Sequence, residues 1–130
     1  MTTQLLIDAD IAIYKATTAN EVPINWDGDL WSLHCDMAKV KCDIDDYVNN
    51  IKEKTNATKV TMCISHQNNF RKLINPKYKL NRKATRKPVC FVPAKKYVME
   101  TYEYEIQPWL EADDVIGILA TYDNGTEKIV

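Results

Sequence analysis

The chain has 130 residues, and its hydrophobic content of 45% is enough for one domain with a buried core, residues 1–130. The opening MTTQLLIDAD has no basic stretch before its apolar residues, and no long apolar segment follows, so we expect neither a secretory signal nor a membrane span. We therefore expect an intracellular, cytoplasmic protein. The net charge of -1 hides an uneven distribution of charge along the chain. Ten of the 17 basic residues and none of the 18 acidic residues lie between Ser65 and Met99. A basic segment of this kind favours a polyanionic partner.

The cysteines indicate reduced thiols rather than a disulfide framework. There are only four, at positions 35, 42, 63 and 90, and they are scattered along the chain. Cys63 with His66, and His34 with Cys35, lack the paired spacing of a zinc site, so zinc is disfavoured.

The first half of the chain predicts two strands with a long helix between them. QLLID (4–8) is a compact apolar run typical of a short buried strand. From Leu30 to Ile51 the apolar residues recur at helical spacing, with Asp29 as the N-cap, which predicts a long amphipathic helix. Asn56 breaks that pattern, and KVTMCIS (59–65) is typical of a central parallel strand.

The second half predicts a basic segment outside the sheet, followed by alternating helices and strands. Prolines punctuate the basic segment, about 66–97, which argues against a core element there. We expect a short helix at 93–101 with Pro93 in its first turn, a strand at 101–107, a helix at 111–122, and the start of a strand at 128–130. This alternation predicts an α/β fold, with helices flanking a mostly parallel central sheet.

Acidic residues gather where two of these strands end. In a parallel sheet the carboxyl ends of the strands meet at one edge, so Asp8 and Glu111 are expected to lie together. On a helix, positions 111 and 114 share a face, while 113 is turned about 160° from 111. The acids at 111, 113 and 114 are either helix-start residues stabilised by the helix dipole or ligands of a cation that offsets their repulsion.

Once Asp8 joins this group, a hard dication becomes the favoured interpretation. Carboxylates suit Mg²⁺ or Mn²⁺, and two such ions would activate a water and stabilise the leaving oxygen in phosphodiester hydrolysis. Asp10 fits two roles equally well, as a further ligand or as a loop or helix cap. The candidate metal ligands are therefore Asp8, Glu111, Asp113, Asp114 and, as the additional one, Asp10.

The basic segment predicts a nucleic-acid contact. In FRKLINPKYKLNRKATRKP the cations alternate with Phe70 and Tyr78, so they can neutralise phosphates while an aromatic ring stacks on a base. A merely solvated face is the alternative. The candidate contacts here are Arg71, Lys72, Tyr78, Lys79, Arg82, Lys83, Arg86 and Lys87.

Three motifs together, IDADIAIYKA, SHQNNFRKLINPKYKLNRK and LEADDVIGILA, resemble the 5′ nuclease superfamily of flap endonucleases and 5′→3′ exonucleases, and most closely those of lytic phages. The resemblance extends over most of the chain, including a tryptophan-bearing helix at 31–38. It implies a PIN-like N-terminal domain, a basic arch-like insertion, and DNA cleavage with Mg²⁺ or Mn²⁺. Asp8, Glu111, Asp113 and Asp114 match metal-site carboxylates of the superfamily, whereas Asp10 lies where its members vary.

The resemblance also implies roles for individual residues. Asp8 and Asp113 would be catalytic as metal-site carboxylates, and Lys79 would be catalytic beside the scissile phosphate. Tyr78, Lys79 and Arg82 match a Y-K-x-N-R element at the base of the arch, where Arg82 would hold the neighbouring phosphate. Lys15 is either a phosphate contact or a solvated helix residue.

The sequence departs from the superfamily at its end. Relatives continue into an S-x-D-x-D pair of further ligands and a helix-hairpin-helix, and neither is present in the 130 residues. We therefore expect an N-terminal portion, a split-gene product or a minimal relative, and a downstream fragment becomes an expected partner. DNA with a duplex 5′ end or 5′ flap is the expected substrate, and an RNA–DNA hybrid is a further one. The alternatives are a non-catalytic nucleic-acid-binding module and a PIN-type ribonuclease.

Overall fold

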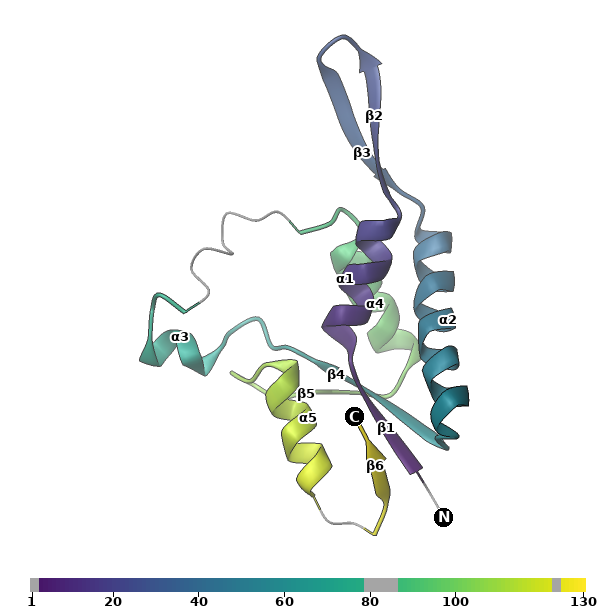
Figure 1. The fold of residues 1–130 in the computed structure, drawn as a ribbon. Helices are drawn as coiled ribbons and strands as arrows, with labels where there is room; N and C mark the ends of the chain where they lie inside the picture. Colours follow the sequence, from purple (N-terminus) through teal and green to yellow (C-terminus); the bar gives the residue numbers. More distant parts are fainter. Residues whose placement is uncertain (1–2, 79–86, 123–124) are drawn as a thin grey trace.

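A four-stranded parallel sheet forms the centre of the fold (Figure 1). Its order is β5 (Tyr104–Ile106), β4 (Lys59–Ile64), β1 (Thr3–Asp8) and β6 (Glu127–Ile129). All three neighbouring pairs are parallel. The predicted α/β fold with a mostly parallel sheet is confirmed, and it is consistent with a PIN-like arrangement.

The computed structural model describes residues 3–78, 87–122 and 125–130. Each of the four cysteines lies within this part of the chain and each is free, as the sequence predicts.

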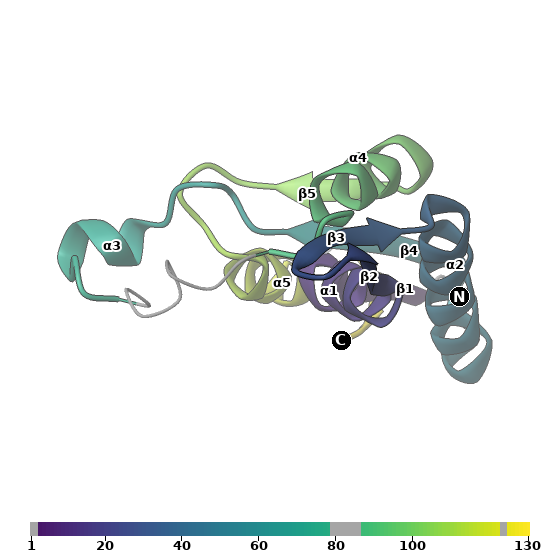
Figure 2. The same cartoon turned by 90° about the horizontal axis from the view of Figure 1, so that it is seen from above.

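Helices cover both faces of the sheet (Figures 1 and 2). On one face α1 (Ala9–Ala19), α2 (Met37–Thr55) and α4 (Phe91–Thr101) contact one another and pack on the strands. The opposite face carries α5 (Ala112–Thr121). Successive side chains of a strand point to opposite faces, so the interior divides into two apolar clusters, one on each face of the sheet.

The first cluster is the larger. It joins Leu5 and Ile7 of β1 to Ile13 of α1 and Ile44 of α2, whereas Leu6, between the two β1 residues, packs with α5 in the second cluster. This alternation is the burial pattern of a central strand covered on both sides.

Local signals in the sequence explain where the helices begin and end. The carboxylate of Asp36 accepts the amide of Ala38 and so caps the start of α2. Asn56 ends α2 in the left-handed conformation, with φ 53°, as expected of the residue that breaks the pattern. Pro93 lies in the first turn of α4, which begins at Phe91. The predicted helix at 111–122 is confirmed as α5, with Glu111 as its N-cap.

The helix expected from Leu30 is wrong over its first residues. The chain instead forms an antiparallel hairpin of β2 (Glu21–Asp27) and β3 (Leu30–Cys35), which extends away from the helices (Figure 1). Gly28 provides the turn with a φ of +53°. The apparent helical spacing failed because Leu30 and Leu33 are exposed, so their positions did not mark a buried face. The tryptophan-bearing helix at 31–38 is wrong for the same reason.

Two other boundaries differ from the expectation. Residues 9–19 form a helix directly after β1, although the sequence analysis predicted no helix or strand with defined ends there. The strand expected at 101–107 is reduced to β5, because α4 continues to Thr101.

The described part of the basic segment lies outside the sheet, as predicted. It contains the short helix α3 (Phe70–Ile74), which extends from the body of the molecule in both views (Figures 1 and 2). Lys79, Arg82, Lys83 and Arg86 lie outside the described residues. Among the described helices, none is both long and apolar enough to cross a lipid bilayer.

Ile44→Ala and Trp31→Thr form a matched test of where the core lies. Ile44 is fully buried, so its truncation should cost about 2–5 kcal/mol of unfolding free energy. Trp31 is 59% exposed on the hairpin, so its replacement should cost less than about 1 kcal/mol. Urea unfolding followed by circular dichroism measures both, and a Trp31→Thr loss as large as that of Ile44→Ala would contradict the separation of hairpin and core.

Candidate metal and nucleic-acid site

A cavity of about 620 Å³ opens beyond the carboxyl ends of β1 and β4, and acidic side chains line it. Asp8 and Asp10 come from the junction of β1 and α1, and Glu111 and Asp113 come from the start of α5. The two acidic groups therefore meet at one edge of the sheet, as the strand order predicts. The rest of the lining is Ile11, Ser65, His66, Gln67, Asn69, Lys72, Lys87 and Ala112.

The turn from β1 into α1 positions the first pair of carboxylates. Asp8 is the N-cap of α1, and its Oδ1 accepts the amide of Asp10 at 3.1 Å. Asp10 is therefore not the cap but a first-turn residue, and its Oδ2 accepts the amide of Ser65 at 3.2 Å. Its predicted role as a metal ligand stays a prediction.

The charge on Asp8 is poorly compensated. Burial raises the pKa of its carboxyl above the ordinary value, and the neighbouring charge of Asp10 raises it further, with a smaller contribution from Asp113. Hydrogen bonds from the amides of Ile11 and Asp10 lower this pKa, but they do not cancel the effect. A cation in the cavity would relieve this repulsion.

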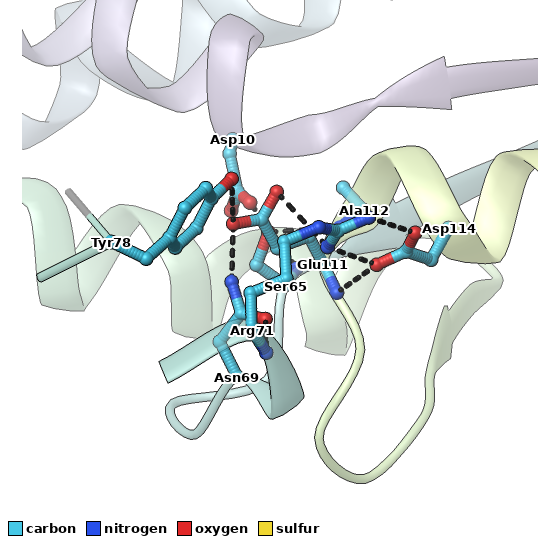
Figure 3. Close-up of polar contacts among 8 residues, drawn as sticks. All are labelled: Asp10, Ser65, Asn69, Arg71, Tyr78, Glu111, Ala112 and Asp114. Carbon is cyan, nitrogen blue, oxygen red and sulfur yellow. Dashed lines mark hydrogen bonds and ion pairs between the residues drawn. The ribbon is translucent and has the colours of Figure 1, made fainter. Parts of the chain in front are cut away.

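Asp114 lies outside the cavity lining and contacts Arg71 instead (Figure 3). The Arg71 guanidinium donates to both oxygens of Asp114, at 2.7 and 2.6 Å, which is the bidentate geometry of a strong ion pair. Asp114 also accepts the amide of Glu111 at 3.0 Å and so helps to cap α5. The bond from Arg71 holds the pKa of Asp114 below its usual value.

Glu111 lies between the cavity and Arg71. Its Oε1 accepts hydrogen bonds from Asn69 and from the Tyr78 hydroxyl, the latter at 3.2 Å, and its Oε2 is 3.7 Å from Arg71 Nη1 (Figure 3). Glu111 and Asp114 thus share one cationic partner, whereas Glu111 and Asp113 both line the cavity. The predicted pairing of 111 with 114 holds for their contact with Arg71 only, because Glu111 is the extended N-cap of α5 and not a helical residue.

The donors fit a hard dication by their chemistry. The cavity offers carboxylate oxygens, including those of Asp8, which is partly buried and whose ionised form is disfavoured. In the described part of the chain, however, no three His, Cys, Asp or Glu side chains already converge on one ion position. Cys63 is unsuited to be a ligand, because burial raises the pKa of its thiol to about 12 and the charges of Asp8 and Glu105 add to this.

The described residues that were predicted to bind nucleic acid divide into three groups. Lys72 and Lys87 line the cavity. Arg71 and Tyr78 contact Glu111, and Arg71 also contacts Asp114. Lys15 lies 5.8 Å from the centre of the Tyr47 ring, outside the cavity lining. The nucleic-acid contacts of all five stay predictions, and the remaining four candidates lie outside the described residues.

Two polar residues of the site were not singled out from the sequence. Asn69 is only 7% exposed, caps α3 through the amide of Arg71, and donates to Glu111. Ser65 donates its amide to Asp10 and accepts the amide of Ala112, so it links the two acidic groups through the end of β4. An Asn directly before FRKLI is a recognisable N-cap signal, but its contact with Glu111 depends on the tertiary fold.

Comparison with known proteins finds two phage enzymes. An Enterobacteria phage T3 protein named exodeoxyribonuclease is 32% identical over 123 residues, and an Escherichia phage T7 protein named exonuclease is 31% identical over the same length. Each match covers 90% of this chain but 41% of the relative, so the chain spans about two fifths of their length. No protein-family model and no solved structure matches. By sequence, this chain is similar to these two phage proteins over 123 residues.

Proposed function

We propose that the chain acts, alone or within a longer protein, as a metal-dependent nuclease that hydrolyses DNA phosphodiester bonds from a 5′ end or at a 5′ flap. The supporting observation is the cavity in which Asp8, Asp10 and Asp113 face the same space as Lys72 and Lys87. Carboxylates that repel one another beside lysines suit a phosphate bridged by divalent cations. The kinship with two phage exonucleases supports the same reaction class and DNA as the substrate.

Asp8, Asp10, Glu111 and Asp113 are the residues that would hold Mg²⁺ or Mn²⁺, with Asp114 as a further candidate next to them. Two bound ions would supply an activated water and charge stabilisation at the leaving oxygen. The chain itself positions these donors through two helix starts, since Asp8 caps α1 and Glu111 caps α5. Both caps face the carboxyl edge of the sheet.

The basic residues would bind and orient the strand. Lys72 and Lys87 line the cavity and would neutralise phosphates next to the carboxylates. From the family resemblance, Lys79 would lie beside the scissile phosphate and Arg82 would hold the next one. From the same resemblance, a polypeptide that supplies the further acidic pair of the superfamily is a proposed partner.

A non-catalytic nucleic-acid-binding module is the second candidate. The observation that favours it is the absence, among the described residues, of three ligand side chains that converge on one point. Such a module would bind DNA with a strong salt dependence and would not cleave it with any metal.

Asp8→Asn tests the cavity as a metal site through stability. Because the folded-state pKa of Asp8 is raised, its ionised form destabilises the folded chain, and this cost grows as pH rises above the ordinary pKa and is complete above the folded-state pKa. Asn keeps the N-cap and removes the charge, so without metal the variant should melt higher by roughly a few degrees.

Mn²⁺ should reverse this order. At about 100 times its dissociation constant the ion should stabilise the wild type by roughly 2.7 kcal/mol and the Asp8→Asn variant much less. Thermal unfolding at pH 7, with and without Mn²⁺, measures both effects. Equal Mn²⁺ stabilisation of the two proteins would contradict a role of Asp8 as a ligand.

The reaction itself is tested with duplex and flap DNA carrying a label on the 5′ strand, in the presence of Mg²⁺. The chain should shorten the labelled strand, alone or with a polypeptide supplying the downstream part. Asp113→Ala should reduce the rate at least about 100-fold, since loss of supporting residues around a metal already costs up to about that much. Lys77→Ala removes a charge outside the cavity lining and serves as the control. Salt-sensitive binding without cleavage in every mixture would favour the binding module.

A further inference from the structure

Arg71 occupies an unusual position for a residue of the basic segment, because it is directed at protein carboxylates. It makes two hydrogen bonds to Asp114 and lies 3.7 Å from Glu111. The aromatic rings of Phe70 and Tyr78 flank it, with centres 4.7 and 6.0 Å from the guanidinium carbon. Only 32% of its side chain is exposed. These contacts hold a fixed positive charge at the start of α5.

The site therefore contains two kinds of carboxylate. Asp114 is hydrogen-bonded to the guanidinium of Arg71, and this contact lowers its pKa. Asp8 is raised in pKa by burial and by its acidic neighbours. Glu111 lies between them, because it lines the cavity and also faces Arg71. A dication that recruits Glu111 or Asp114 must compete with the charge of Arg71 for the same oxygens.

We propose that Arg71 is a positioning residue that neutralises Asp114 and Glu111 and competes with a divalent cation for these two carboxylates. The inference rests on the proposed function, since it assumes that the cavity binds such a cation. It concerns how tightly the cation binds, which the assignment of ligands alone does not determine.

The same contacts connect the metal site to the basic segment. Asn69 caps α3 through the Arg71 amide and donates to Glu111, and the Tyr78 hydroxyl donates to Glu111 as well. Residues at both ends of the described stretch 69–78 are thus bonded to one carboxylate. Movement of Glu111 toward a cation would weaken these two contacts, while the Arg71–Asp114 pair would still hold the stretch, so cation binding and the placement of the segment are coupled.

Arg71→Gln tests the competition through Mn²⁺ affinity, measured without nucleic acid from the electron paramagnetic resonance signal of free Mn²⁺. Loss of the positive charge should tighten Mn²⁺ binding by about three- to tenfold, a range reduced from the full Coulomb value because Arg71 is partly exposed. Lys77→Gln is the matched control, since it removes the same charge from the same segment outside the cavity lining, and it should change the affinity less than about twofold.

Arg71→Lys provides a second, independent measurement. It keeps the charge and loses the bidentate geometry, so its Mn²⁺ affinity should stay within about twofold of the wild type. Unchanged or weaker binding in Arg71→Gln would overturn the inference, as would tightening of equal size in Arg71→Lys. A wild-type chain that binds no Mn²⁺ would instead refute the proposed metal site itself, so the two failures are distinguishable.

Discussion

Electrostatic repulsion among carboxylates at one sheet edge is the constraint on which the site depends. Two helices begin at this edge, and each begins with acidic residues, so Asp8 and Asp10 face Glu111 and Asp113. Amide hydrogen bonds at the helix starts stabilise part of this charge, and Arg71 neutralises another part. Burial, together with the remaining repulsion from Asp10 and Asp113, raises the pKa of Asp8. A fold stable enough to tolerate this electrostatic repulsion can keep carboxylates available for a ligand.

The sheet supplies the rigidity that this arrangement needs. Parallel pairing sets Asp8 opposite Cys63, which places Ser65 within reach of both acidic groups. Apolar clusters on both faces hold β1 and β4 in place, so the side chains at their ends are presented from a buried scaffold. Most of the hairpin lies outside this core, whereas the basic segment enters it at its end, where Cys90 and Ala94 are buried. Charge attraction to a polyanion and the positioning of carboxylates are thus assigned to different parts of the chain.

The sequence predicted the features that local pattern controls. Short apolar runs identified β1 and β4, and the strand order then implied that Asp8 and Glu111 share an edge. The hairpin was missed because exposed Leu30 and Leu33 imitated the spacing of a buried helix face, and only the turn at Gly28 distinguishes the two. The partners of Arg71 could not be predicted, since residues 71 and 114 are joined by tertiary structure alone. From sequence alone, a basic residue in a segment with a Phe and a Tyr is equally compatible with a phosphate contact.

The central claim is that the cavity carboxylates hold a divalent cation. Anomalous X-ray diffraction from crystals of the chain soaked in Mn²⁺ tests it most directly, because the method locates the ion independently of activity. The account predicts a manganese peak in the cavity within about 2.0–2.4 Å of oxygens from Asp8 and Asp113. Peaks confined to other surfaces of the protein, or none at saturating Mn²⁺, would contradict it.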